Sequence, residues 1–300
     1  MDEHGAQQLG LPQKPWVLMG FYTFEDLRKP PYPQRLLNLI EKTETLHNET
    51  KFRRYAGSLY RGVATDEYEN RFRTFALSRH RLQMEQELTK GLLRDLTLFD
   101  WNNLEKSSIS YKIRCLGKPE ENPYDPTWIK PNWIIVEFAA CFSDEPRFFP
   151  RFLELGKDIF TSIKAAYGYI DFDHTPRDLW LIHMGQLYTH YKELWDEIEA
   201  WTLQQRYCRE RVKKAFWGNF LNVEHVRQLG GFSKIKEAVP YKIVESLPEG
   251  GALLIASGHP AEKDRPDVAR RIAQLQAFLK PILMKIEPIP PRHPKHHPPA

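Results

Sequence analysis

The chain is poor in cysteine, with three such residues among 300. They are Cys115, Cys141 and Cys208, which lie far apart and form no Cys-x-x-Cys pair. Closely spaced cysteines are the usual sign of a disulfide framework or a zinc site, so this spacing argues against both. We therefore expect reduced, buried thiols, which are typical of a cytoplasmic protein.

Neither sign of charge dominates the sequence. It holds 43 Lys and Arg against 39 Asp and Glu, which gives a formal net charge of +4. A protein that binds nucleic acid directly usually shows a clustered basic surface, and this small excess does not indicate one. The apolar runs are short, such as Trp-Ile-Ile-Val at residues 133–136, and cannot span a bilayer. The first residues are acidic and polar, unlike a secretory signal, which also favours the cytoplasm.

Motifs that carry well-known catalytic chemistry are missing as well. The chain has neither a glycine-rich phosphate loop nor a Gly-x-Ser-x-Gly nucleophile elbow. Asp171, Asp173 and His174 are the one compact set of candidate metal ligands. Because carboxylates and imidazole bind divalent metals, a metal-dependent hydrolase is one hypothesis, although the same residues suit a polar turn. The sequence otherwise predicts a protein that is not an enzyme and needs no cofactor or metal.

Apolar periodicity predicts a folded protein with both strands and helices. Hydrophobic residues make up 41% and aromatic residues 13% of the chain, enough for a substantial core. Strand-like composition occurs at residues 16–22, 107–116, 133–142, 241–245 and 252–256. Helical spacing of apolar residues occurs at residues 34–46, 145–167, 187–206 and 264–279. Because strands and helices do not alternate regularly, we expect an α+β fold, with a mainly antiparallel sheet packed with several long helices in a single compact domain.

Two intervening segments are assigned from their composition. Residues 51–90 are rich in charge, and their apolar residues follow helical spacing, which predicts a partly buried helix. Its charged face is interpreted as a solvated surface, with a docking surface for an acidic partner as the alternative. The apolar residues concerned are Tyr68, Phe72, Phe75, Leu82 and Leu88. Residues 118–126 contain three prolines, which predicts a loop.

The composition changes at both ends of the chain. Residues 1–14 are polar and give no periodic pattern, so we expect a flexible leader. Residues 286–300 are rich in proline and histidine, a composition that forms neither a helix nor a sheet ladder and predicts a disordered tail. The folded domain is therefore expected to extend over residues 15–285.

A series of short motifs in the last third of the chain carries a family resemblance. In order, they are Trp217, Leu229-Gly230-Gly231, Gly250-Gly251, Ala256-Ser257-Gly258-His259-Pro260, Asp264 and Leu279-Lys280-Pro281. Residues 163–169 add a similar helix end, with Ala166-Tyr167 where a histidine is usual. The series resembles the immunity proteins of bacterial type VI secretion and polymorphic-toxin systems, and most closely the group paired with VRR-type nuclease toxins.

The resemblance implies a cytoplasmic immunity protein that neutralises a cognate toxin by forming a stoichiometric complex. A toxin that acts on nucleic acid would present a basic surface, so the candidate partner-binding residues are mainly acidic. They are Asp171, Asp173, His174, Glu193, Asp196 and Glu197. Direct binding to nucleic acid or to a membrane is not expected, and the oligomeric state is left open.

The motif residues themselves are interpreted as determinants of the fold and not as contact residues. They are Trp217, Gly218, Asn219, Gly230, Gly231, Gly250 and Gly251. The Gly230-Gly231 pair would allow a helix to end in the left-handed conformation. A non-catalytic scaffold or adaptor is the main alternative to an immunity protein, ahead of the hydrolase considered above.

Overall fold

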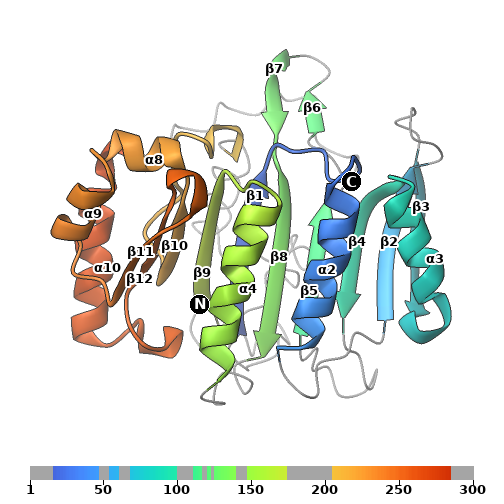
Figure 1. Ribbon diagram of the computed structural model, residues 1–300, viewed down its shortest axis with the longest axis horizontal. Helices are drawn as coiled ribbons and strands as arrows, with labels where there is room; N and C mark the ends of the chain where they lie inside the picture. Colours follow the sequence, from blue (N-terminus) through green and yellow to red (C-terminus); the bar gives the residue numbers. More distant parts are fainter. Residues whose placement is uncertain are drawn as a thin grey trace, which may run out of the picture.

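The computed structural model of this protein describes residues 16–46, 54–60, 68–99, 111–116, 120–122, 125–139, 147–173 and 205–284 (Figure 1). These residues contain one large sheet and one small sheet. The strands of the large sheet are β1 (Trp16–Thr23), β2 (Arg54–Tyr60), β3 (Tyr68–Ala76), β4 (Leu93–Phe99), β5 (Tyr111–Leu116), β8 (Asn132–Ala139), β9 (Tyr167–Asp173), β10 (Gly218–Leu221), β11 (Ile243–Ser246) and β12 (Ala252–Ile255). The small sheet pairs β6 (Glu120–Asn122) with β7 (Asp125–Lys130).

The large sheet is antiparallel at every strand pair described. Its strand order is β11-β12-β10-β9-β1-β8-β5-β4-β2-β3. Strand β1 lies near the centre between β8 and β9, and β10 joins β9, so the C-terminal strands extend the sheet toward the end at β11. The predicted α+β fold with a mainly antiparallel sheet is confirmed.

Six α-helices accompany the sheet in the part of the chain that the structure describes. They are α2 (Tyr32–Glu44), α3 (Leu77–Thr89), α4 (Phe148–Ser162), α8 (Val223–Gln228), α9 (Phe232–Ala238) and α10 (Pro266–Phe278). Figure 1 shows α4, α2 and α3 in front of the sheet, with α8, α9 and α10 gathered at its β11 end. Of these described helices, none has the length and apolar character needed to cross a bilayer.

Helix α4 supplies much of the core through one apolar face. Its Phe148 and Phe152 rings stack at 5.4 Å between centroids, and both meet the Phe138 ring of β8 edge-on, at 5.3 and 5.8 Å. All three side chains are buried completely. Edge-on and stacked aromatic contacts add to the free energy gained from burial alone, so α4 is fixed firmly on the sheet.

Helix α4 ends earlier than its apolar pattern predicts. Lys164 takes a left-handed conformation with φ of 49°, and the amides of Lys164 and Ala165 donate to the carbonyls of Thr161 and Phe160 at 3.2 and 2.8 Å. This pair of hydrogen bonds is a Schellman motif, which usually has glycine where Lys164 stands. Because lysine does not signal a helix end in the sequence, the predicted helix at residues 145–167 overran into β9.

The predicted helix within residues 51–90 is partly wrong. Tyr68, Phe72 and Phe75 belong to strand β3, and only Leu82 and Leu88 lie on a helix, α3. Tyr68 and Phe72 are four residues apart, a spacing that fits one face of a strand as well as one face of a helix, and aromatic residues favour strands. Leu88 is buried as expected, whereas Leu82 is 69% exposed.

Other expectations have mixed outcomes. The segment at residues 118–126, predicted as a loop, contains β6 and the start of β7. The strands expected at residues 241–245 and 252–256 are confirmed as the antiparallel pair β11 and β12. The leader at residues 1–14, the tail at residues 286–300 and nearly all of the helix at residues 187–206 lie outside the described residues, and they stay predictions.

Replacing Lys164 by glycine should stabilise the protein. Glycine adopts the left-handed conformation without a Cβ clash, so Lys164→Gly is expected to raise the free energy of unfolding by about 0.5–1 kcal/mol, after its greater freedom in the unfolded chain is taken into account. Urea denaturation monitored by circular dichroism measures the change. Lys164→Ala removes the same charge but keeps Cβ and should give no gain. Equal stability of the two variants would contradict this explanation.

Candidate partner-binding site

A groove of about 940 Å³ lies between α4 and the β11 end of the sheet. Side chains alternate between the two faces of a strand, and this alternation brings Ile243 and Glu245 of β11 to the groove together with Leu253 and Ile255 of β12. The facing wall comes from α4 and from the end of α2. The groove is therefore built from segments that are more than 200 residues apart in the sequence.

The acidic side chains of the groove are all engaged by lysines. Lys157 of α4 forms ion pairs with Glu154 on its own helix and with Glu245 on β11, both at 2.8 Å. Lys42 at the end of α2 pairs with Asp158 at 2.5 Å. Partial burial acts against the charged form of Lys157, but the hydrogen bonds that Lys157 donates to the two glutamates outweigh it and raise its pKa. These pairs link α2, α4 and β11 across the groove.

Two further cations in the groove have no carboxylate within ion-pair distance among the described residues. Arg151 on α4 is exposed, and its guanidinium donates only to the Leu46 carbonyl, at 3.5 Å. Lys242 is exposed immediately before β11, and its Nζ lies against Gly258, where a Cβ would be only 2.8 Å away. The groove thus carries paired acids and two cations that are available to a ligand.

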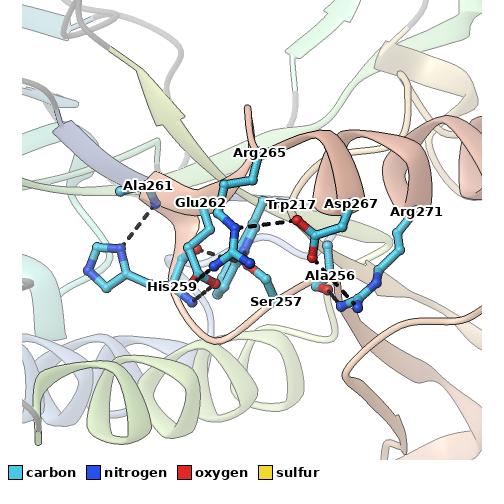
Figure 2. A network of polar contacts seen from close by, with 9 residues as sticks. All are labelled: Trp217, Ala256, Ser257, His259, Ala261, Glu262, Arg265, Asp267 and Arg271. Carbon is cyan, nitrogen blue, oxygen red and sulfur yellow. Dashed lines mark hydrogen bonds and ion pairs between the residues drawn. The ribbon is translucent and has the colours of Figure 1, made fainter.

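One end of the groove is formed by a turn with a dense hydrogen-bond network (Figure 2). The indole Nε1 of buried Trp217 donates to Ser257 Oγ at 2.8 Å, and that hydroxyl donates to the His259 carbonyl at 2.9 Å. His259 Nδ1 accepts from the Ala261 amide at 3.1 Å, and Glu262 accepts from the His259 amide at 3.3 Å. These hydrogen bonds hold the turn in one conformation at the end of the groove.

A smaller, polar cavity of about 440 Å³ adjoins the groove and shares Lys242 and Ser257 with it. Figure 2 shows Asp267 between Arg265 and Arg271, at 3.3 and 3.9 Å. Arg265 also pairs with Glu262 at 3.0 Å. Partial burial raises the pKa of Glu262, but hydrogen bonds from Ser257 and from backbone amides, with the Arg265 charge, outweigh it and lower the pKa. These charges satisfy one another and stabilise the start of α10.

The helix start itself differs from the sequence pattern. The helix predicted at residues 264–279 begins at Pro266, Arg265 occupies the position before it, and no side chain caps the first turn. The acid that acts at this end is Asp267, within the first turn, where negative charge favours the helix dipole.

Of the predicted partner-binding residues, only Asp171 has a described side chain. It lies in strand β9 and not in a polar turn, as does the backbone of Asp173. Its Oδ1 accepts from the Phe172 amide at 2.9 Å and lies 3.5 Å from Lys263 Nζ, which also donates to the Phe172 carbonyl. Asp171 therefore ties β9 to the segment before α10.

The other members of this set are not placed. His174, Glu193, Asp196 and Glu197 lie outside the described residues, so their role stays a prediction. Among the residues that are described, no group of three or more His, Cys, Asp and Glu side chains is arranged to hold a metal ion.

The motif residues Trp217, Gly218 and Asn219 are buried within the fold. Trp217 is 1% exposed, and the amide of buried Asn219 closes a loop by accepting from the Phe216 amide at 3.0 Å and donating to its carbonyl at 2.8 Å. At Gly218 a Cβ would lie 2.9 Å from Ile170 Cβ on the neighbouring strand. These positions leave little surface that a partner could contact.

The two glycine pairs lie in turns. Gly230 and Gly231 have φ values of 90° and 95°, and their amides donate to the Arg227 and Val226 carbonyls at 3.0 and 2.9 Å, which ends α8 in a Schellman motif. Gly250 has φ of 84° in the turn between β11 and β12, and Gly251 follows it there.

A capping pair that sequence reasoning missed fixes the start of α8. Asn222 Oδ1 accepts from the His225 amide at 2.9 Å, and His225 Nδ1 accepts from the Asn222 amide at 3.3 Å. The side-chain Nδ2 of Asn222 also donates to the backbone carbonyls of Ala166 and Arg209, at 2.7 and 2.9 Å. The Asn-x-x-His spacing before a short apolar pattern was the available signal.

A known family matches the segment that contains these motifs. Residues 196–297 match the family model TsiV, described as type VI immunity for VRR-NUC. The predicted resemblance is confirmed over this segment, about a third of the chain. It includes strands β10, β11 and β12, which form the sheet side of the groove.

A solved structure has a similar fold. The Pseudomonas aeruginosa T6SS protein PA0821 superposes with a TM-score of 0.61, at 15% sequence identity, over 90% of this chain and 76% of that chain. At this identity the likeness shows the fold alone. No curated protein matches the chain significantly.

The buried His225 should make the protein less stable in mild acid. Burial lowers the pKa of His225 to about 4 in the folded protein, whereas an unfolded histidine titrates near 6.5. Between these values only the unfolded chain takes up the proton, so stability present at neutral pH is lost as the pH falls. The expected loss from pH 7 to pH 5 is about 2 kcal/mol in free energy of unfolding.

Urea unfolding at several pH values tests this expectation. His225→Gln should flatten the dependence of stability on pH between 7 and 5, whatever its effect on absolute stability. His80→Gln, a change at a partly exposed histidine of α3, is the matched control and should leave the slope as it is. A slope that is the same with and without His225 would show that another group is responsible.

Proposed function

We propose that this protein is an immunity protein that binds a cognate toxin of a type VI secretion system and neutralises it by forming a stoichiometric complex. The observation that carries the proposal is the match of residues 196–297 to a family described as type VI immunity for VRR-NUC. The toxin is accordingly a nuclease of the VRR type. The matched segment contributes the strands and the turn that form one side of the groove.

The geometry of the groove supports binding without turnover. Its walls are held by ion pairs between α2, α4 and β11, and its end by the Trp217–Ser257 hydrogen bond. A surface that is already ordered loses little conformational entropy when a partner docks, which favours tight association. Specificity for one toxin then comes from complementary shape and charge.

The proposed site of action is the cytoplasm. A nuclease toxin damages the cell where nucleic acid is found, so its inhibitor is needed in the same compartment. Cys208 is a free thiol that is buried, and burial raises its pKa and lowers its reactivity. Such a thiol suits a reducing environment.

Co-production of the protein with the VRR-type toxin encoded beside its gene tests the proposal. The chain should restore growth of cells that produce the toxin, and the two proteins should elute together with a mass equal to the sum of one or more equimolar pairs. A toxin of an unrelated nuclease family, produced in the same way, should remain lethal and unbound. Loss of growth together with separate elution of the cognate pair would refute the assignment.

A further inference from the structure

The two ends of the large sheet differ in how readily they could accept another strand. Strand β11 ends the sheet on one side, and β12 is its only strand partner among the described residues. The β11–β12 pair is regular, whereas the strand at the other end, β3, pairs with β2 across a register shift of the kind that a bulge produces. Bulges hinder further pairing at an edge, and regular edges invite it.

The side chains of β11 also leave apolar surface at this edge. Ile243 and Val244, on opposite faces of the strand, are only partly buried. Glu245 is the one charged side chain of the strand and is held by Lys157 at 2.8 Å. An added strand would cover both apolar side chains, while its backbone would pair with the open edge of β11.

The charges beside this edge favour an added strand with acidic side chains. Lys242 adjoins β11, and Arg151 stands on the opposite wall of the groove, each without a carboxylate partner among the described residues. The acids of the groove, Glu154, Asp158 and Glu245, are occupied by lysines already. Each wall of the groove therefore carries one cation without a carboxylate partner among the described residues, and these two cations complement aspartate or glutamate side chains.

We propose that the occupant of the groove is an extended acidic segment of the toxin, which adds a strand to β11 and directs its carboxylates to Lys242 and Arg151. The inference rests on the proposed immunity function and specifies its contact surface. It differs from the sequence-based expectation, in which acidic residues of this chain would contact a basic surface of the toxin.

Charge reversal tests the electrostatic part of the inference. Lys242→Glu and Arg151→Glu should each weaken binding of the purified toxin about tenfold at low ionic strength, and the double variant should also reduce the salt dependence of binding. The control is Lys90→Glu, the same change at an exposed lysine at the end of α3, toward the far edge of the sheet. Isothermal titration calorimetry measures the affinities, and circular dichroism verifies that each variant is folded.

Binding of the toxin by the wild-type protein distinguishes the proposed immunity function from the proposed contact surface. If the wild-type protein fails to bind the toxin, the proposed function is wrong and the inference falls with it. If the wild type binds and the Lys242 and Arg151 variants bind equally well, the function stands and the acidic occupant is wrong.

Hydrogen exchange tests the added strand independently of charge. In the complex with the full-length protein, the backbone amides of Val244 and Ser246, which point away from β12, should exchange more slowly than in the free protein, because an added strand would accept hydrogen bonds from them. Amides of β3 at the opposite edge should be unchanged. Unaltered exchange at Val244 and Ser246, with protection elsewhere on the surface, would place the toxin at a different site.

Discussion

Strands β1, β9 and β10 approach one another closely at Gly168, and this approach fixes how the large sheet is assembled. Gly168 of β9 lies opposite Phe21 of β1 and Phe220 of β10, and a Cβ on Gly168 would be 2.5 Å from the Phe21 ring. The two rings fill this space and meet edge-on, 5.0 Å apart between centroids. Because large side chains occupy the room left by glycine, the register of the three strands is strongly specified, and β10 brings β12 and β11 into the same sheet.

The groove is a consequence of this continuous sheet. Helix α4 packs on the central strands, and the sheet extends beyond it to β11, so a channel remains between the helix and the last strands. Lys157 of α4 forms an ion pair with Glu245 of β11 across the groove, and the hydrogen bond of Trp217 with Ser257 holds the turn at one end. The same residues that stabilise the fold thus define a rigid surface, and rigidity is what an inhibitor needs to bind tightly without chemistry.

Much of the fold could be predicted from the sequence, and most of the site could not. The apolar patterns gave β1, α2, β8 and the β11–β12 pair, and the short motifs gave the resemblance that the match at residues 196–297 confirms. Helix α4 was predicted too long because its left-handed end is at Lys164, and β3 was taken for a helix because a four-residue spacing suits both structures. The groove was missed because it joins residues such as Arg151 and Lys242 that only the folded sheet brings together.

The proposed immunity function is stoichiometric capture of a toxin through a folded surface. Titration of the protein into a fixed amount of the purified cognate toxin, with cleavage of a DNA substrate followed by fluorescence, tests it most directly. With stoichiometric capture, nuclease activity should fall linearly and vanish near one molar equivalent. Complete inactivation by a small fraction of an equivalent would indicate turnover, and undiminished activity at a large excess would indicate no capture; either result would refute stoichiometric capture.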